Sequence, residues 1–263
     1  DIPHTEIKLD MGRKLTAQHL APYEGQGFTG FLVNLDETST GVLYDIQLIS
    51  DFCHRNDIFL VVDSISSFLA DPFDMAALGV DVMITGSQKA LACPPGISII
   101  VLAPQSVDRV CANKVKSMYF NLEDALKNGE RGQTPFTPAV SILIQLNSRL
   151  KELAKDNGKA EHAKIAERAS YFRNIIKELP FTVFTDSSAL SNCVTALKVN
   201  DEKVSAHRLF EVVKDEYKIW ICPNGGELKD KVFRVGHIGN LSLSDYDSLA
   251  EALKKALAKL EEN

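Results

Sequence analysis

The chain has 263 residues, 45% of them hydrophobic, and its 29 Lys and Arg against 35 Asp and Glu give a net charge of −6. This size allows one large domain or two modest ones, and the absence of a basic stripe argues against nucleic acid as a partner. No apolar run approaches the roughly 20 residues that span a bilayer. The expectation is therefore a soluble cytoplasmic protein without a membrane segment.

The first half of the chain alternates predicted strands with predicted helices. Strands are expected at the apolar runs Thr5–Leu9, Gly30–Leu35, Ile58–Val62, Val80–Ile84 and Ile97–Leu102. Helical spacing predicts helices over Leu15–Tyr23, residues 42–55 and Asp74–Leu78. Because the strands are continuously apolar, the pattern predicts an α/β fold with a mostly parallel sheet covered on both faces.

The pattern changes near Gly158. Before it, residues 105–130 mix helix and loop, two prolines exclude a helix from Arg131–Pro138, and Ala139–Leu153 is helical. After it, helices are predicted over residues 159–178, Ser205–Tyr217 and Ser244–Glu261, and strands over Phe181–Phe184, Val194–Val199, Ile219–Ile221 and Val232–Val235. We predict a large domain over residues 1–157 and a small α+β domain over residues 158–263.

The candidate chemistry lies at two strand ends. Lys89 follows the strand Val80–Ile84, and Asp63 directly follows the strand Ile58–Val62. Open α/β sheets bind ligands at the carboxyl edge of their parallel strands, so these two charged residues predict a site there. Considered singly, Lys89 can be a solvated loop lysine and Asp63 a helix N-cap. The five cysteines have no metal-type spacing, and no metal site is expected.

Six short motifs extend this site along the chain. They are Glu37-Thr38-Ser39-Thr40-Gly41, Val62-Asp63-Ser64, Gly86-Ser87-Gln88-Lys89-Ala90, Pro94-Pro95-Gly96, Thr137-Pro138 and Arg234-Val235-Gly236. In this order and spacing they resemble class V aminotransferases, which are pyridoxal-phosphate enzymes of fold type I. The resemblance covers essentially the whole chain and is strongest to the alanine–glyoxylate, serine–glyoxylate and 2-aminoethylphosphonate–pyruvate aminotransferases. It implies a fold type I large domain that is incomplete at its N-terminus.

The resemblance implies a role for each residue of the site. Lys89 would hold the aldehyde of pyridoxal 5′-phosphate as a Schiff base and then move the proton of the substrate α-carbon. Asp63 would keep the ring nitrogen protonated. Arg234 would bind the substrate carboxylate with its two-donor fork. Further cofactor contacts are implied at Thr38, Ile65, Gln88 and Thr137.

Thr137 would reach the phosphate of the neighbouring subunit's cofactor, which implies a homodimer with shared active sites. Thr134 stands where some relatives place a tyrosine that makes a similar contact. The phosphate-binding glycine/serine-rich loop and the aromatic residue that stacks on the ring both come from a part of the family's chain that precedes this sequence. Without them, cofactor binding is expected to be weak.

Structural roles remain open for several of these residues. Ser39 and Thr40 can cap the helix predicted to begin near Val42. Arg234 can pair with a core carboxylate such as Glu227 or Asp245 instead of a substrate. His237 follows Arg234 by three residues and either lines the substrate pocket or belongs to the loop after the strand.

The predicted function is transamination of a small amino acid with pyruvate or glyoxylate as acceptor. One alternative is another pyridoxal-phosphate reaction, such as cysteine desulfuration or β-elimination. Desulfurases usually carry a histidine before the lysine and a nucleophilic cysteine on a mobile loop. Here Gln88 precedes the lysine, and Cys222 lies between Ile221 and Pro223, where a strand end is expected. The other alternative is a truncated chain without activity.

Overall fold

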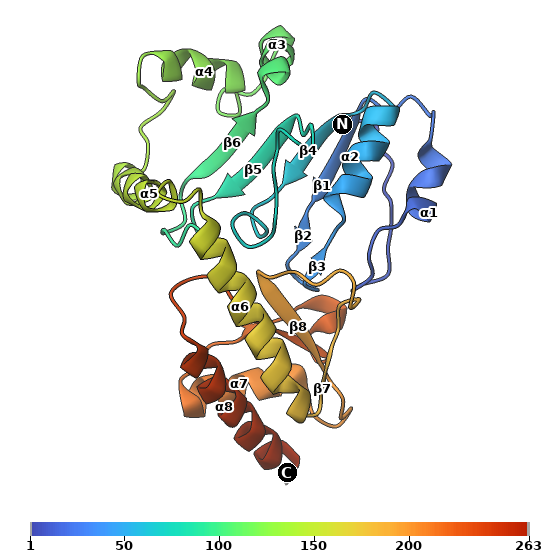
Figure 1. Cartoon of the computed structure of the whole chain (residues 1–263), viewed down its shortest axis with the longest axis vertical. Coiled ribbons are helices and arrows are strands. Elements are labelled where there is room, and N and C mark those ends of the chain that lie inside the picture. Colours follow the sequence, from blue (N-terminus) through green and yellow to red (C-terminus); the bar gives the residue numbers. More distant parts are fainter. Residues whose placement is uncertain (1, 262–263) are drawn as a thin grey trace.

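The computed structural model describes residues 2–261, which form two separate four-stranded sheets (Figure 1). The strand order of the first sheet is β1-β4-β5-β6. Its strands are β1 (Gly30–Asn34), β4 (Phe59–Asp63), β5 (Val82–Gly86) and β6 (Ser98–Leu102). The first three are parallel and β6 is antiparallel to β5, which confirms a mostly parallel sheet.

The helices around the first sheet come from the first 153 residues. They are α1 (Ala17–Leu20), the 3₁₀ turn η1 (Ala21–Tyr23), α2 (Ile46–Arg55), α3 (Pro104–Ala112), α4 (Leu122–Glu130) and α5 (Val140–Leu153). Helix α2 covers one sheet face, because its Ile49 and Phe52 belong to the same buried cluster as Leu60 and Val62 of β4. Strand alternation sends every second residue of β4 to that face.

The opposite face of the first sheet is partly uncovered. Leu32 of β1 is 78% exposed and Ile100 of β6 is 40% exposed. Arg109 of α3 lies over the ring of Phe59, 4.3 Å from its centroid, at the amino end of β4. The prediction that both faces are covered is therefore wrong for this part of the sheet, because no helix of residues 2–261 buries Leu32.

A small hairpin replaces the beginning of the helix predicted over residues 42–55. Strands β2 (Asp36–Glu37) and β3 (Val42–Leu43) pair with each other, and Val42 also bridges to Leu190, so the helix begins only at Ile46. The cap of α2 is Asp45, whose Oδ1 accepts a hydrogen bond from Leu48 N at 3.1 Å. The interpretation of Ser39 and Thr40 as caps of this helix is therefore wrong.

Four other predicted elements differ from the structure. Residues 5–9 form no strand, although Ile7 and Leu9 still pack on the core of the first sheet. Asp74–Leu78 is a hydrogen-bonded turn and not a helix, and β5 is shifted two residues along the chain relative to Val80–Ile84. Residues 219–221 are not a strand, because pairing with β10 begins only at Cys222. In these four segments the backbone hydrogen-bond partners determine the secondary structure, and the periodicity of apolar residues does not.

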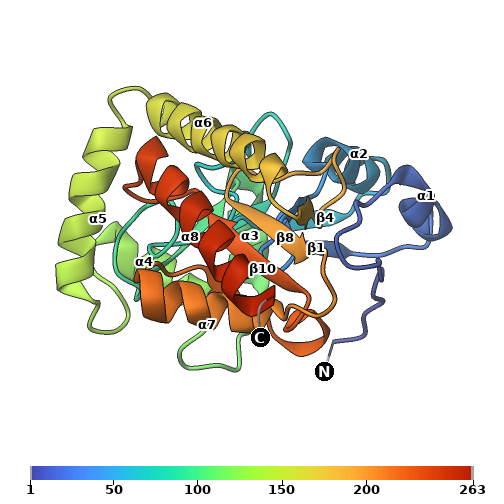
Figure 2. The ribbon, with the colours of Figure 1, turned by 90° about the horizontal axis from the view of Figure 1, so that it is seen from below.

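The second sheet is antiparallel, with strand order β7-β8-β10-β9. Its strands are β7 (Phe181–Val183), β8 (Val194–Val199), β9 (Cys222–Pro223) and β10 (Val232–Gly236). The helices are α6 (Lys159–Ile175), α7 (Ala206–Tyr217) and α8 (Leu243–Glu261), with 3₁₀ turns η2 (Ile176–Glu178) and η3 (Gly226–Leu228). Figure 2 shows α8 between α6 and α7 over the sheet, where Phe172, Leu197, Phe233 and Leu253 form a fully buried core.

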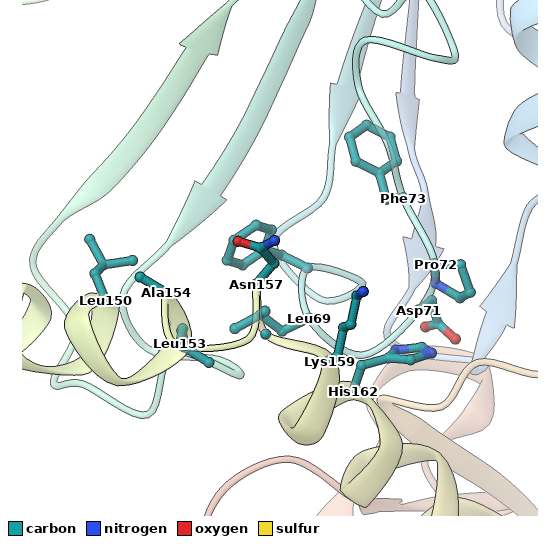
Figure 3. A pocket seen from close by; sticks show the side chains of 12 residues that line it. Leu69, Asp71, Pro72, Phe73, Leu150, Leu153, Ala154, Asn157, Lys159 and His162 are labelled. Atoms are coloured by element: carbon teal, nitrogen blue, oxygen red, sulfur yellow. The ribbon is translucent and has the colours of Figure 1, made fainter.

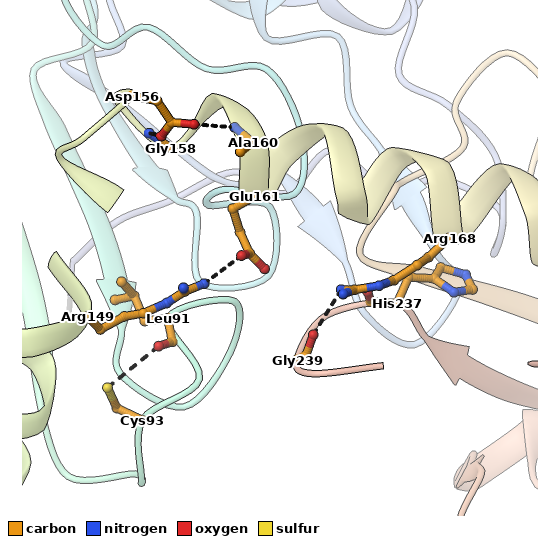
Figure 4. Close-up of polar contacts among 10 residues, drawn as sticks. All are labelled: Leu91, Cys93, Arg149, Asp156, Gly158, Ala160, Glu161, Arg168, His237 and Gly239. Carbon is orange, nitrogen blue, oxygen red and sulfur yellow. Dashed lines mark hydrogen bonds and ion pairs between the residues drawn. The ribbon is translucent and has the colours of Figure 1, made fainter. Parts of the chain in front are cut away.

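The turn between α5 and α6 is held by charged groups (Figure 4). Asp156 accepts hydrogen bonds from Gly158 N at 3.0 Å and Ala160 N at 2.8 Å at the start of α6. Arg149 and Glu161 form an ion pair of 2.9 Å across the turn. The boundary predicted between residues 157 and 158 falls in this turn, and the division into two domains stays a prediction. Within residues 2–261, no helix combines the length and apolar character needed to cross a bilayer.

Candidate active site

Asp63 and Lys89 lie at the same edge of the first sheet. Strands β1, β4 and β5 are parallel, so all three end at one edge, which faces the β2–β3 hairpin and the second sheet (Figure 1). Asp63 is the last residue of β4 and pairs in register with Ile84 of β5, while Lys89 is the third residue after β5. This is the edge at which open α/β sheets bind ligands.

The loop that carries Lys89 is closed by Ser87. Its hydroxyl donates to Pro94 O at 2.7 Å and accepts from Ile97 N at 3.3 Å, so both ends of the loop are tied together. The neighbouring Ala90 and Leu91 are each 1% exposed and anchor the loop in the core. Lys89 itself is half-buried, and its amine makes no hydrogen bond or ion pair with residues 2–261. The backbone of Lys89 is therefore fixed while its amine remains available, and this combination is suited to a nucleophile.

Gln88 lies next to the strand end but is exposed. A Cβ added to Gly86 would be only 2.6 Å from Gln88 Oε1, so the amide folds back over the end of β5. The side chain therefore lies at the sheet edge, where the cofactor phosphate region is expected.

Asp63 and Ile65 are held by a tight turn after β4. Asp63 Oδ1 accepts a hydrogen bond from Ile65 N at 2.8 Å, and Ser64 N donates to Ile84 O at 2.8 Å. Turns and no helix follow, so the interpretation of Asp63 as a helix N-cap is wrong. Asp63 Oδ2 accepts no hydrogen bond from the described part of the chain.

Thr38 and Arg234 connect this edge to the second sheet. Thr38 Oγ1 lies 2.6 Å from Ser66 Oγ, on the turn after Asp63. Arg234 of β10 donates from Nη1 to Thr38 O at 3.1 Å and from Nη2 to Pro223 O at 2.8 Å. Its Nε is buried without a hydrogen-bond partner. The structure thus joins Arg234 to Thr38 directly, and joins Thr38 through Ser66 to the turn that holds Asp63 and Ile65.

The guanidinium of Arg234 has no carboxylate within 4.0 Å among residues 2–261, so the proposed pairing with Glu227 or Asp245 is wrong. Asp245 instead accepts hydrogen bonds from Ser242. A cation that contacts only carbonyl groups and keeps a buried N–H unpartnered is suited to an anionic ligand.

Thr137 is not brought to this site within one chain. It is exposed and lies in the irregular segment before α5, as predicted for residues 131–138. In the same segment Thr134 donates from its hydroxyl to Phe136 O at 2.6 Å. The contact of Thr137 with a neighbouring subunit's cofactor stays a prediction.

His237 belongs to the segment directly after β10, which confirms the loop alternative, and its side chain is buried in the core beside the second sheet. It is 0% exposed, and its Nε2 lies 2.8 Å from Thr195 Oγ1. Figure 4 shows it beside Arg168, which donates to Gly239 O at 2.8 Å. Burial, helped by Arg173 and Arg168, lowers the pKa of His237 to about 3, so the ring is neutral at physiological pH.

The sequence reasoning missed a buried polar cluster beside the site. It consists of Asp36, Asp71 and Ser191, and burial raises the pKa of Asp36 to about 7. The available signal was the position of Asp36, which directly follows the strand residues Gly30–Leu35 just as Asp63 ends β4. Nothing in the sequence connects it with Ser191, 155 positions away.

Asp71 also lines a cavity of about 570 Å³ between the β4–β5 loop and the α5–α6 turn (Figure 3). The wall is mostly apolar, with Phe68, Leu69, Leu150 and Leu153, and His162 lies next to Asp71. Lys89 and Arg234 do not line it. The cavity is therefore separate from the sheet edge that carries the candidate active site.

Comparison with known proteins places the chain in a family. The family profile described as "Aminotransferase class-V" matches residues 5–227. Among curated proteins, the chain is 27% identical over 245 residues to the "Soluble hydrogenase 42 kDa subunit" of Anabaena cylindrica, covering 93% of this chain and 63% of that protein. It is 28% identical over 236 residues to "Serine--glyoxylate aminotransferase" of Arabidopsis thaliana, covering 87% of this chain and 58% of that enzyme.

The fold agrees with a solved enzyme of the same kind. An aspartate aminotransferase of subgroup IV from Thermus thermophilus matches with a TM-score of 0.84 at 26% identity, over 95% of this chain and 69% of that structure. The chain therefore spans about 60% of the length of the curated relatives described. It belongs to the class V aminotransferase family, the pyridoxal-phosphate-dependent enzymes of fold type I.

Proposed function

We propose that this chain carries out transamination of a small amino acid, with pyruvate or glyoxylate as the amino acceptor. The observation that carries the proposal is the position of Asp63 and Lys89 at one edge of the first sheet, next to Thr38, which contacts Ser66 on the turn after Asp63 and accepts a hydrogen bond from Arg234. The names of three relatives support the acceptor, since they are serine–glyoxylate, alanine–glyoxylate and 2-aminoethylphosphonate–pyruvate aminotransferases.

The groups left unpartnered at this edge fit pyridoxal phosphate. Lys89 has a free amine to bind the cofactor aldehyde covalently, and Asp63 Oδ2 is available to hold a proton on the ring nitrogen. Thr38 Oγ1 and the Gln88 amide supply further polar contacts, and Ile65 an apolar one. When bound, the cofactor supplies the electron sink that stabilises the substrate carbanion. Lys89 Nζ is the base that would take the proton from the substrate α-carbon and hold it.

We assign the substrate carboxylate to Arg234. Its guanidinium presents two terminal nitrogens and a buried Nε, a geometry that matches two carboxylate oxygens. The two carbonyl oxygens of Thr38 and Pro223 accept hydrogen bonds from its terminal nitrogens. A carboxylate adds the negative charge that these carbonyls lack.

Replacing Arg234 by glutamine should raise the KM for the amino acid and the oxo acid by about 10–150-fold, because hydrogen bonds to a charged group contribute about 1.5–3 kcal/mol. The measurement is steady-state kinetics with both substrates. Arg208→Gln is the matched control, because the Arg208 side chain is 69% exposed on α7. An unchanged KM in a folded Arg234→Gln protein would remove Arg234 from the substrate site.

The active unit in this proposal is a homodimer. A run of large apolar side chains precedes α4 and α5 and is exposed, with Met118 at 81%, Phe120 at 79% and Tyr119 at 66%. Tyr119 stacks on Phe136, one residue before Thr137. Exposed apolar patches of this kind mark association surfaces. A second chain packed on this patch would cover the segment that carries Thr137, as the assignment of Thr137 to the neighbouring subunit's cofactor phosphate requires.

Transamination is favoured over cysteine desulfuration by the position of Cys222. Its backbone belongs to β9 and pairs with Arg234, so it is held in a sheet rather than on a mobile loop. Two structures described as NifS-like proteins match at only 12% and 16% identity, which is a likeness of fold alone.

An absorbance spectrum with added pyridoxal phosphate tests the proposal. We expect a visible band that borohydride removes, and we expect L-alanine to bleach it and glyoxylate to restore it. Sulfide release from L-cysteine without any response to L-alanine would favour desulfuration. Absence of a band at every cofactor concentration would favour a chain without activity of its own.

A further inference from the structure

Three buried polar side chains meet where the β2–β3 hairpin contacts the second sheet. Asp36 begins the hairpin, Asp71 lies on the loop between β4 and β5, and Ser191 precedes β8. Their exposed fractions are 5%, 4% and 0%. None of the three belongs to the cofactor or substrate contacts proposed above. Because an unpaired buried carboxylate is costly, two of them at one place require a physical explanation.

The hydrogen bonds of Ser191 supply that explanation. Ser191 Oγ lies 2.6 Å from Asp36 Oδ2 and 3.1 Å from Asp71 Oδ2, and it accepts a hydrogen bond from Cys193 N at 2.9 Å. A hydroxyl has one proton, so it can donate to only one of the two carboxyl groups. The contact with the other is favourable only when that carboxyl is protonated and donates to Ser191 Oγ. The geometry therefore requires one proton on the pair.

The two carboxyl groups are not equivalent. Asp71 Oδ1 accepts a hydrogen bond from Asn192 N at 3.0 Å, whereas Asp36 Oδ1 is buried without any hydrogen-bond partner. The negative charge is therefore better solvated on Asp71. The resulting chain runs from the protonated Asp36 Oδ2 to Ser191 Oγ and from the Ser191 proton to Asp71 Oδ2.

The charges around the pair agree with this assignment. Burial is the main cause that raises the pKa of Asp36 to about 7; the hydrogen bond with Ser191 and the nearby Lys89 lower it, and Asp71 and Glu37 raise it. Burial also raises the pKa of Asp71. The hydrogen bonds with Asn192 N and Ser191 lower it, as do His162 and Arg173, which both lie on α6.

Two thiols complete the set of titratable groups that face the pair. Burial raises the pKa of Cys193, which stays neutral, and Cys222 of β9 lies close enough to raise it further. The pair therefore has Lys89 on the side of Asp36 and Arg173 and His162 on the side of Asp71, with no other buried carboxylate among the described residues.

The same residues connect the two sheets. Ser191 N donates to Gly41 O at 3.1 Å, and Arg173 donates to Ser191 O at 2.9 Å. The hairpin held in this way also carries Thr38, whose carbonyl accepts from Arg234. Asp71 also lines the cavity of about 570 Å³ in Figure 3, whereas Asp36 and Ser191 do not line it.

We propose that Asp36 and Asp71 share a single proton through Ser191, and that this proton fastens the β2–β3 hairpin to the segment before β8 and makes the junction between the sheets pH-sensitive. The shared proton does not depend on the proposed function; only its consequence for Thr38 does. The pKa of Asp36 is raised from 3.8 to about 7, so its contribution to stability is complete below 3.8 and is lost as the pH rises through about 7.

Carbon-13 NMR of the protein labelled at the aspartate carboxyl carbons tests the shared proton directly. We expect one carboxyl resonance, absent in Asp36→Asn, to titrate near pH 7. Asp71→Asn should lower that midpoint by removing a like charge, and Lys89→Met should raise it by removing a cation. A midpoint near 3.8 in the wild-type protein would overturn the proposal without any need for a variant.

Denaturant unfolding of Asp36→Asn tests the consequence for stability. The amide can donate to Ser191 Oγ at every pH, so the stability of the variant relative to wild type should increase between about pH 4 and about pH 7 and stay constant above that. Asp108→Asn is the matched control, because Asp108 is exposed on α3 and should show no such trend. A difference for Asp36→Asn that is the same at all pH values would contradict the proposal.

Amide exchange at the junction tests the fastening itself. Asn192 N and Cys193 N donate to Asp71 Oδ1 and Ser191 Oγ. After correction for the intrinsic rate, their protection should fall as the pH rises through about 7 in the wild-type protein and remain constant in Asp36→Asn. If the protection of these two amides did not change while Asp36 titrates, the shared proton would not hold the hairpin to the segment before β8.

Discussion

Replacing Lys89 by alanine should reduce transamination by at least ~10³-fold and abolish the visible band that forms with pyridoxal phosphate. The variant loses both the amine that binds the cofactor aldehyde and the base that takes the α-proton. The protein should remain folded, because the loop is closed by Ser87 and anchored by Ala90 and Leu91 rather than by the Lys89 side chain. Absorbance spectra and single-turnover assays with L-alanine measure the two losses separately.

Two variants control for this result. Lys89→Arg keeps a positive charge at the same place but offers no amine that can bind the aldehyde, so it should behave like Lys89→Ala. Lys254→Ala changes an exposed lysine on α8 and should have no effect. A borohydride-sensitive band that persists in both Lys89 variants would show that another amine binds the cofactor.

Replacing Asp63 by asparagine should lower the rate by about 10²-fold or more while the cofactor band still forms. Asparagine keeps an oxygen that can accept from Ile65 N, so the turn after β4 should survive. It loses the negative charge that holds a proton on the ring nitrogen, and a neutral ring is a weaker electron sink. Single-turnover kinetics measures the rate, and the spectrum shows that Lys89 still reacts.

This pattern separates the two residues. Loss of rate with retention of the band is expected for Asp63, and loss of both for Lys89. Asp63→Glu keeps the charge with one extra methylene and should recover part of the rate. Equal rates in wild type and Asp63→Asn would show that the carboxylate does not act on the ring nitrogen.

Much of the fold could be predicted because burial produces periodicity. The runs that form β1, β4 and β6 are apolar enough to identify strands within one or two residues, and α5, α7 and α8 show helical spacing over their whole length. Predictions failed at short elements, where a partner distant in sequence decides. Val42 and Leu43 fit the spacing of a helix, yet they pair with β2, and Val42 also bridges to Leu190.

The candidate site likewise has a part that local sequence predicts and a part that it does not. The location of Asp63 and Lys89 at one edge of the sheet could be predicted, because parallel strands bring their carboxyl ends to the same edge. The contact of Arg234 with Thr38 spans 196 positions, and no local pattern encodes it. The spacing of His237, three residues after Arg234, leaves a pocket position open, but burial, helped by Arg173 and Arg168, makes it a neutral core residue.

Local patterns of apolar and polar side chains are enough to predict the residues of the sheet core and the charged residues at the strand ends. The partners of those charges depend on how segments distant in sequence pack together. In the sequence, Asp36 is a polar residue that follows a strand, and nothing distinguishes it further. In the folded chain it is buried beside Ser191 and Asp71. Burial removes water, and without water the protonation of a carboxyl group depends on the few groups that remain beside it.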